Sequence, residues 1–586
     1  MSLEQAIVVA ALAALVALLV RGRHAPAAVF ASVAFLFILL GYVSVDDALK
    51  QVANKGLVTV VVLLLLSVVL DKSRLLEAAA ESLVKGPYRW SLFKLYGATA
   101  LYSAFLNNTA VVASLIGPLR GNKHHAASRL LMPMCFAATL GGVLTLVGTS
   151  TNLLMNSFLI GRDMPGLKMF DLLPVGGALL LGCGVLIVLT YPRLMKNRPA
   201  KTEVLSDYFV EATVKTGSRL IGKTVEANGL RNLGHLFLTE VVRGERLIAP
   251  VEPGEVLVDN DVLVFAGDVT RLDLLTRFDG LQTQGQHEDL PLDNLVEVVV
   301  SVHSALARRT VRELDFRSQF DAAVVAVRRG KERLGGSIGN TRIEVGDTLV
   351  LVVGPDFEKR NNLARNFVIV SRRSVQKFVD PRKAWLSMAG FVAVIALSAF
   401  GIIDFLKGLL VLLAAFVALG FARWPELRRN VPYEIIVIIG AALIISEVTI
   451  TTGTASLMAT VLLGSAAQWG PHAALALILL VTWLLTEAMS NNAAAALAFP
   501  VAIGVAEQLG LAPQPFVMAV LYGASCSFVT PYGYQTNLMI MSPGRYTLGD
   551  YARAGLPVAV MYLAICLLVI PAAFPFDQST LSRARP

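Results

Sequence analysis

The sequence predicts a polytopic α-helical membrane protein, built as an inverted repeat with two re-entrant hairpins and with a soluble insertion between its halves. Composition is the first observation: 55% of the 586 residues are hydrophobic and 16% are charged, whereas soluble domains carry roughly 25% charge. The second is the gathering of charge in residues 196–382. The third is a cluster of amide and hydroxyl side chains that appears in both flanking apolar parts.

The N-terminal membrane half is expected at residues 1–195. Its apolar runs approach the roughly 20 residues that cross a bilayer, and they lie at 5–20, 26–43, 56–71, 127–160 and 170–191. A further run near 91–119 is interrupted by Asn107, Asn108 and Thr109, which predicts a re-entrant hairpin with its tip at the asparagines. The run at 127–160 is broken by Gly148, Thr149, Ser150, Thr151 and Asn152.

The soluble insertion contains a tandem repeat of its own. The segment Val210–Val214 matches Val296–Val300 at an offset of 86 residues, and the same offset relates Asp261 to Asp347. Short β-branched strands that alternate with turns predict two small α+β modules. We expect the first module at 203–285 and the second at 290–373.

The C-terminal membrane half, residues 383–577, repeats the plan with extra helices in front. Its spans are expected at 383–402, 404–421, 433–450, 454–469, 472–486 and 555–575. A second re-entrant hairpin is predicted near 487–508, with Ser490, Asn491 and Asn492 at its tip. A broken span at 514–546 is interrupted by Gly533, Tyr534, Gln535, Thr536 and Asn537. Asn108 and Asn152 are 44 positions apart, and Asn491 and Asn537 are 46 positions apart.

Basic residues orient the chain, because lysine and arginine are enriched in cytoplasmic loops. They lie at Arg21 and Arg23, at Arg120 and Lys123, at Arg193 to Arg198, at Arg372 to Lys383 and at Arg423 to Arg429. With these loops inside, the first hairpin enters the bilayer from the cytoplasm and the second from the opposite side. The halves are then inverted in the plasma (inner) membrane, and residues 196–382 are cytoplasmic.

The asparagine clusters need partners, because an unsatisfied polar group in hydrocarbon costs several kcal/mol. One interpretation is that they only mediate close helix packing. Their duplication beside broken helices favours a transport site shared by the two halves. Helix N-termini at a break attract anions, and amide and hydroxyl oxygens suit Na+, a hard cation. One site could therefore bind Na+ together with an anion.

Other function classes receive no support from the residues. The four cysteines have no CxxC spacing, and the chain contains neither a catalytic triad nor a phosphate-binding loop, so we do not expect an enzyme. The net charge of +9 is explained by the cytoplasmic loops, and no nucleic-acid partner is expected. Glu487 is open to two interpretations, a proton or cation ligand or a charge at the outer surface where the hairpin begins, and we favour the second.

Asn107-Asn108-Thr109-Ala110 and Ser490-Asn491-Asn492-Ala493 resemble the two Ser-Asn-Thr hairpin signatures of the divalent anion:sodium symporter family, within the ion transporter superfamily. The two inserted modules resemble the TrkA-C domain, the ligand-sensing C-terminal (RCK) module of potassium-channel and transporter regulators. Together these features resemble most closely the bacterial and algal sulfate-transporter branch. The resemblance implies a homodimer in the lipid bilayer, an elevator movement of the transport domain, and a small-molecule or nucleotide regulator of the modules.

The resemblance also implies roles for individual residues. The substrate-binding residues would be Asn107, Asn108, Thr109, Ser490, Asn491, Asn492 and Tyr534. The sodium-binding residues would be Asn108, Gly148, Asn152, Asn491, Gly533 and Asn537. Further candidates from the polar clusters are Thr149, Ser150, Thr151, Gln535 and Thr536. The sequence departs from the signatures at Asn107, at Asn492 and at Gln535-Thr536, where the dicarboxylate carriers have Pro-Pro, and this weakens a dicarboxylate assignment.

The expected function is therefore a sodium-coupled symporter that imports a small divalent oxyanion, sulfate first, with TrkA-C-like modules that regulate it. A C4-dicarboxylate or a sulfonate is the alternative substrate. A ligand-gated anion channel or a transceptor is the alternative of another class.

Overall fold

The structure is a computed structural model of the whole chain. It describes residues 1–21, 24–52, 54–70, 75–162, 164–198, 209–230, 233, 236–244, 246–248, 251–267, 275, 277–284, 295–301, 304–314, 316–330, 332–334, 338–354, 356–357, 360, 362–369, 381–429, 431–464 and 470–577. The expected module boundaries at 203, 285, 290 and 373 lie outside the described residues, and so does Arg23.

The part of the chain before the insertion is helical. Its helices are α1 (Leu3–Arg21), α2 (Pro26–Leu39), α3 (Val45–Val52), α4 (Lys55–Leu70), α5 (Leu75–Val84), α6 (Tyr88–Ser103), α7 (Asn108–Arg120), α8 (Ala127–Gly142), α9 (Ser150–Gly161) and α10 (Leu173–Leu194). The part after the insertion contains α13 (Pro381–Ala399), α14 (Phe405–Ala418), α15 (Trp424–Arg429), α16 (Tyr433–Thr451), α17 (Thr454–Leu463), α18 (Pro471–Ala488), α19 (Asn491–Leu509), α20 (Gln514–Ser525), α21 (Gln535–Met541) and α22 (Leu548–Ala573).

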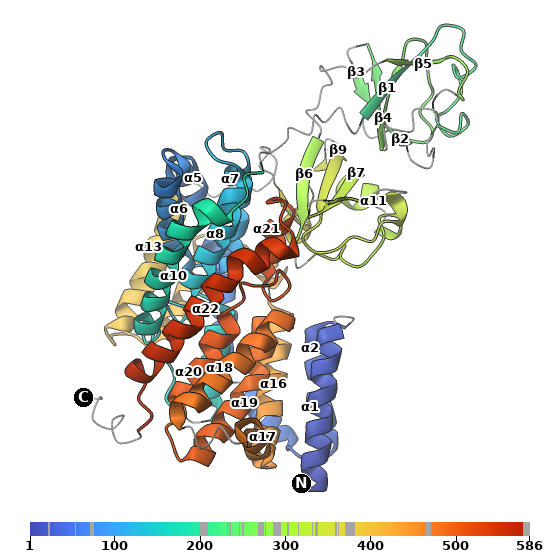
Figure 1. Cartoon of the computed structure of the whole chain (residues 1–586). Helices are drawn as coiled ribbons and strands as arrows, with labels where there is room; N and C mark the ends of the chain where they lie inside the picture. Colours follow the sequence, from blue (N-terminus) through green and yellow to red (C-terminus); the bar gives the residue numbers. More distant parts are fainter. Residues whose placement is uncertain are drawn as a thin grey trace.

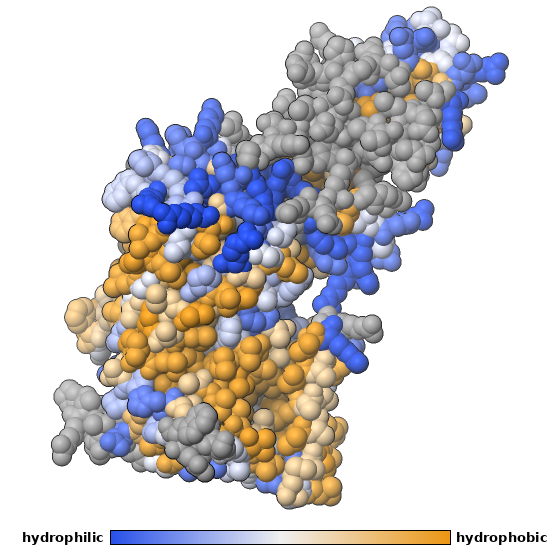
Figure 2. Space-filling view, in the orientation of Figure 1, coloured by the Kyte–Doolittle hydropathy of each residue, from blue (hydrophilic) through white to orange (hydrophobic). Residues whose placement is uncertain are grey.

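Six of the described helices are long and apolar enough to cross a membrane, namely α1, α10, α16, α18, α19 and α22. A seventh span is possible if α3 and α4, which meet at a bend of 42°, cross together. Figure 2 shows a broad hydrophobic surface over this helical part, with hydrophilic residues where it meets the β-rich part. The protein is therefore a polytopic helical membrane protein with a separate β-rich region (Figure 1).

The β-rich region contains two antiparallel sheets of five strands each. The first consists of β1 (Phe209–Val214), β2 (Leu236–Arg243), β3 (Arg246–Ile248), β4 (Val262–Gly267) and β5 (Leu281–Gln284), in the order β3-β2-β4-β1-β5. The second consists of β6 (Leu295–Val300), β7 (Ala322–Arg329), β8 (Glu332–Arg333), β9 (Thr348–Val353) and β10 (Phe367–Ile369), in the order β10-β6-β9-β7-β8. When the second sheet is read from its other edge, as β8-β7-β9-β6-β10, each strand takes the place of its counterpart in the first sheet. The tandem repeat in the sequence therefore corresponds to a repeated topology.

Side-chain contacts repeat between the sheets as well. Arg243 pairs with Asp261 at 2.8 Å in the first, and Arg329 pairs with Asp347 at 2.8 Å in the second. Hydrogen bonding to these aspartates raises the pKa of both guanidinium groups. Each module has its own apolar core, made by alternate residues of its strands. We call the two units the first module (β1–β5) and the second module (β6–β10).

The second module lies against the helical part. Arg120, the last residue of α7, approaches Glu297 of β6 to 2.6 Å. The Thr348 and Ser542 hydroxyls are 2.7 Å apart, between β9 and the turn that follows α21. Val299 of β6 belongs to the buried apolar cluster of the helices and not to the core of its own module. The second module therefore contacts both α7 and the α21–α22 connection.

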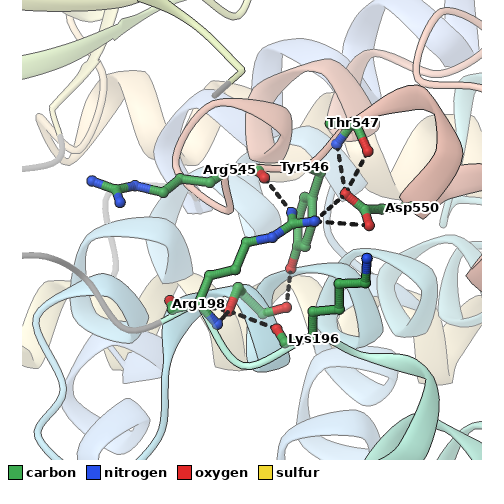
Figure 3. A network of polar contacts seen from close by, with 7 residues as sticks. Lys196, Arg198, Arg545, Tyr546, Thr547 and Asp550 are labelled. Carbon is green, nitrogen blue, oxygen red and sulfur yellow. Dashed lines mark hydrogen bonds and ion pairs between the residues drawn. The ribbon is translucent and has the colours of Figure 1, made fainter. Parts of the chain in front are cut away.

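A polar network holds the chain at the exit of α10 (Figure 3). The Arg198 guanidinium lies 2.8 Å from the Asp550 carboxylate, at the first turn of α22. The Tyr546 hydroxyl donates to the backbone oxygen of Ser128 at 2.9 Å and accepts from the backbone nitrogen of Met132 at 3.0 Å. These bonds join the start of α8, the segment after α10 and the start of α22.

The two helical parts share a packing plan. Helix α6 packs on α8, as α18 packs on α20, and α10 packs on α22. Gly176 of α10 closely approaches the carbonyl of Val143, just after α8, and Gly555 of α22 closely approaches the carbonyl of Phe528, after α20. Neither site has room for a Cβ. Glycine at both positions lets α10 and α22 contact the irregular backbone beside them.

Candidate functional site

Each helical part contains a pair of helices whose junction carries an asparagine cluster. In the first pair, α6 ends at Ser103, α7 begins at Asn108, and the Asn107 side chain accepts from the Thr109 nitrogen at 2.9 Å. In the second pair, α18 ends at Ala488 and α19 begins at Asn491. The Ser490 hydroxyl accepts from the Ala493 nitrogen at 3.4 Å. Side-chain caps of this kind stabilise a helix start.

The second pair differs from the sequence prediction. A hairpin was expected within residues 487–508, after a separate span at 472–486. Instead α19 runs without interruption over Asn491–Leu509, so α18 is the first arm and the tip lies at Met489 and Ser490. The Ser490 cap gives the physical reason, because it starts a new helix at the point where the sequence suggested that a hairpin begins.

A second break lies in each part, between α8 and α9 and between α20 and α21. The Asn152 amide nitrogen donates to the carbonyls of Gly142 and Thr145 at 2.9 and 2.8 Å. The Asn537 amide nitrogen donates to the carbonyls of Ser527 and Thr530 at 3.0 and 3.3 Å. The paired acceptors precede each asparagine by ten and seven residues in both halves. The two irregular segments, residues 143–149 and 526–534, therefore have the same internal fastening.

The hairpin tips are fastened to these irregular segments. The Thr145 hydroxyl donates to the carbonyl of Ala104 in the first half. The Thr530 hydroxyl donates to the carbonyl of Glu487 at 3.0 Å in the second. Thr145 and Thr530 carry no obvious motif, and the sequence analysis did not single them out. Their signal is positional, since each lies seven residues before its asparagine.

The asparagines at the tips bind polar neighbours of their own half. The Ser103 hydroxyl donates to the Asn108 side-chain oxygen. In the amide orientation that satisfies its hydrogen bonds, the Asn491 nitrogen donates to the Thr486 hydroxyl at 2.8 Å and to the Gly533 carbonyl at 3.0 Å. Asn108 and Asn491 are 2% and 6% exposed, so both amides are withdrawn from solvent.

The two halves meet at these same residues. The Asn108 nitrogen donates to the Tyr534 hydroxyl at 2.7 Å, from the first tip to the break before α21. The Thr151 hydroxyl donates to the Asn492 oxygen at 3.1 Å, and the Asn492 nitrogen donates to the Ser150 hydroxyl at 3.2 Å. Each tip thus contacts the broken helix of the other half. Predicted residues that are more than 340 positions apart in the chain lie together.

The remaining predicted residues occupy the same region. Gly148 closely approaches the carbonyl of Gly142, and an added Cβ at Gly142 would lie 2.7 Å from the Asn108 amide. Thr149 and Tyr534 are the N-cap residues of α9 and α21, and neither side chain makes a capping bond. Gln535 is half-buried and Thr536 is fully buried in the first turn of α21. All sixteen candidates therefore lie at the two tips or the two breaks.

Oxygen atoms in this region are available to a cation. The Asn152 side-chain oxygen and the Ser527 hydroxyl are buried and have no hydrogen-bond partner among the described residues. Ser527 lies against Gly533, where no Cβ could be added. The Asn537 side-chain oxygen, in contrast, accepts from the Cys135 thiol at 3.2 Å. Unpartnered buried oxygens beside a glycine suit a small hard cation, which prefers oxygen ligands.

Glu487 is half-buried and binds backbone groups, a role that neither interpretation from the sequence included. One carboxylate oxygen accepts from the nitrogens of Phe528 and Val529 at 3.1 and 3.0 Å, and the other accepts from Thr530 at 2.8 Å. Its side chain therefore clamps the irregular segment 526–534. Sequence reasoning missed this role, because backbone nitrogen partners leave no mark in the sequence.

An anion would meet helix N-termini here. Helices α7, α9 and α19 all begin at residues of the cluster, and helix N-termini attract negative charge through their unpaired N–H groups. Within the described part of the chain, no lysine or arginine side chain takes part in the hydrogen bonds of the cluster named above. The site can therefore offer dipoles and neutral oxygens to an anion and a cation held side by side.

Comparisons with known proteins agree with a transporter. A family model described as "Citrate transporter" matches residues 8–523. A "Putative sulfur deprivation response regulator" of Chlamydomonas reinhardtii is 32% identical over 91% of this chain and 96% of its own length. An uncharacterized transporter of Synechocystis is 29% identical over 92% of both chains. "Sodium/sulfate cotransporter 1" of Chlamydomonas reinhardtii is 28% identical over 64% of this chain and 44% of its own length. The chain belongs to the citrate transporter (CitMHS) family, and it is a secondary transporter of the membrane and not an enzyme.

Proposed function

We propose that this protein is a sodium-coupled symporter that imports a small divalent oxyanion, with sulfate as the first candidate. The observation that carries the proposal is that each half contains a helix break held by hydrogen bonds of an asparagine side chain. The break of each half contacts the hairpin tip of the other half. A site made in this way offers helix N-termini to an anion and amide, hydroxyl and carbonyl oxygens to Na+. The named activity of the sodium/sulfate cotransporters supports the choice of ions.

The arrangement of the hairpins supports an inverted repeat. Arg120, at the far end of the first hairpin, contacts the second module. In Figure 1 the α17–α19 region lies at the opposite end of the helical part. The two pairs would then enter the bilayer as re-entrant hairpins from opposite faces, with residues 196–382 in the cytoplasm. An elevator movement, a homodimer and a plasma (inner) membrane location complete the proposal.

The modules are proposed to be TrkA-C-like domains that regulate transport by binding a small molecule or a nucleotide. Their support is the contact of the second module with α7 and the α21–α22 connection, two elements that border the site. Regulation requires the ligand to favour one transport state over another. The alternative role, that the modules only stabilise the dimer, is separated by deletion. A chain that lacks residues 203–373 should bind the anion but change its uptake rate, whereas a purely stabilising role predicts monomers.

Uptake into proteoliposomes tests the transport function. An inward Na+ gradient should drive accumulation of labelled sulfate, and a K+ gradient of the same size should not. Competition by thiosulfate, taurine, succinate and citrate identifies the substrate class. Inhibition of uptake by succinate alone would indicate a C4-dicarboxylate carrier, and inhibition by taurine alone would indicate a sulfonate carrier. Sulfate conductance that is independent of Na+ would favour a ligand-gated anion channel and contradict the proposal.

A transceptor is the second candidate function. It is favoured by the relative named a sulfur deprivation response regulator, which aligns along nearly its whole length. The two functions differ in their readout. A transceptor would bind sulfate at the same site. The unmodified protein would then show no measurable uptake in proteoliposomes, and Asn108→Ala would abolish its signal to the cell.

A further inference from the structure

The two halves have matching breaks but different anchors. Glu487 and Ala104 are equivalent residues, since their carbonyls accept from Thr530 and Thr145, the two threonines that lie seven residues before Asn537 and Asn152. The second half therefore has a carboxylate where the first half has a methyl group. Every other fastening of the two breaks described above is neutral.

The carboxylate replaces neutral anchors. Glu487 binds the nitrogens of Phe528, Val529 and Thr530 at 2.8–3.1 Å. In the first half, the corresponding segment is held by carbonyl groups. The nitrogens of Val143 and Leu144, which are equivalent to those of Phe528 and Val529, both donate to the Gly141 oxygen, the Leu144 nitrogen at 3.1 Å. The acceptors that hold the two segments therefore differ in charge.

The charge acts on the atoms that face the second break. The Phe528 nitrogen belongs to the same peptide group as the Ser527 carbonyl, whose oxygen also accepts from Asn537 at 3.0 Å. A hydrogen bond from that N–H to a carboxylate polarises the peptide and makes its carbonyl oxygen more negative. In a low-dielectric interior a nearby negative charge also attracts a cation more strongly than it does in water. Both effects favour a cation at the second break.

We propose that Glu487 makes the two sodium sites unequal. The site at Asn491, Ser527 and Gly533 binds Na+ more tightly than the site at Asn108 and Gly148. This inference rests on the proposed function, because it takes Na+ as the coupled cation. Glu487 is a positioning residue and a fixed charge, and its two oxygens accept three backbone N–H bonds.

Glu487→Gln tests the proposal in proteoliposomes. The amide keeps one acceptor oxygen and the size of the side chain but removes the charge. The Na+ concentration that gives half-maximal sulfate uptake should rise by about tenfold or more. The KM for sulfate at saturating Na+ should stay unchanged. Glu447→Gln is the matched control, because Glu447 lies in α16, pairs with Arg162 at 3.8 Å and belongs to neither break.

Two outcomes would overturn the proposal. One is an unchanged Na+ dependence in a folded Glu487→Gln protein. The other is an uptake rate that falls by the same factor at every Na+ concentration. That result would show that Glu487 has only a structural role. If the unmodified protein itself shows no dependence on Na+, the proposed function fails, and that result is distinct from a failure of this inference.

A second measurement leaves Glu487 intact, in case its replacement prevents folding. Asn108→Ala removes a ligand of the first site, and Asn491→Ala removes a ligand of the second. Calorimetric titration of each purified variant with NaCl, at constant ionic strength, reports the site that remains. Asn108→Ala should retain the tighter Na+ binding, by about tenfold over Asn491→Ala. Equal affinities, or the opposite order, would contradict the unequal sites.

Discussion

The contact of the second module with the helices can be disturbed at a single turn. Gly346, between β8 and β9, has a φ of +84°, and a Cβ added there would lie 2.6 Å from the carbonyl oxygen of Leu538 in α21. Its counterpart in the first module is Asn260, with a φ of +62°. Asparagine tolerates this backbone conformation better than most residues. Gly346→Asn should therefore keep the turn and lose only the close approach to α21.

The size of the effect follows from the overlap. Forcing an extra side chain into a packed contact costs about 1–3 kcal/mol, which corresponds to a change of roughly 5–150-fold in the ratio of docked to undocked module. Hydrogen exchange should become faster in peptides that cover Leu538 to Tyr546. The maximal rate of sodium-driven uptake should change as well, if docking regulates transport.

Asn260→Gly is the control, because it changes the equivalent turn of the first module and adds no atoms. It should leave exchange at Leu538 and uptake as they are in the unmodified protein. If Gly346→Asn undocks the module by hydrogen exchange and uptake remains identical, the regulatory role of the contact is wrong. If exchange itself does not change, the reasoning from the close approach is wrong.

Three further predictions concern the site and the first module. Asn152→Ala and Asn537→Ala each remove an amide that donates to two carbonyls, at roughly 1–3 kcal/mol in total, so both should lower the melting temperature of the detergent-solubilised protein. Asn340→Ala should not, because Asn340 is an exposed residue of the second module. A loss in one half alone would contradict the matching hydrogen bonds of the two halves. Burial raises the pKa of the Glu240 carboxyl in β2 from 4.5 to about 7. The folded state therefore binds the Glu240 proton more tightly than the unfolded state, and the first module should lose about 3 kcal/mol of stability as pH rises from 4.5 to 7. Hydrogen-exchange protection of β2 and β4, corrected for intrinsic rates, measures this loss. A similar loss in Glu240→Gln would refute the assignment to Glu240. Tyr534→Phe removes the hydroxyl that accepts from Asn108 at 2.7 Å and should weaken sulfate binding by about 5–10-fold; unchanged binding in calorimetry would exclude a role for this contact.

Part of this architecture could be predicted from the sequence. The membrane class follows from composition, and the tandem modules follow from an offset that the two sheet orders reproduce. The meeting of Asn108 with Tyr534 and of Asn492 with Ser150 was indicated by the repetition of polar clusters that hydrocarbon cannot accommodate singly. Each of these signals lies in side-chain chemistry that the sequence displays directly.

The remainder depends on backbone groups. The polar residues at Ser490 to Asn492 indicated the tip, but residues 473–485 are almost continuously apolar, so the sequence could not show that α18 is the first arm of the hairpin. The partners of Glu487 are backbone nitrogens some forty residues later. Thr145 and Thr530 act on carbonyl oxygens. Every residue has such groups, and only the fold determines which of them come within reach.

The most direct test of the central claim is uptake of labelled sulfate by proteoliposomes that contain the unmodified protein, Asn108→Ala or Asn491→Ala, with Asn340→Ala, at an exposed asparagine of the second module, as the control. The account predicts sodium-driven accumulation by the unmodified protein and by Asn340→Ala, and none by the two tip variants, although all four proteins remain folded and elute alike in gel filtration. Accumulation by both tip variants at the rate of the unmodified protein would contradict the assignment of the site.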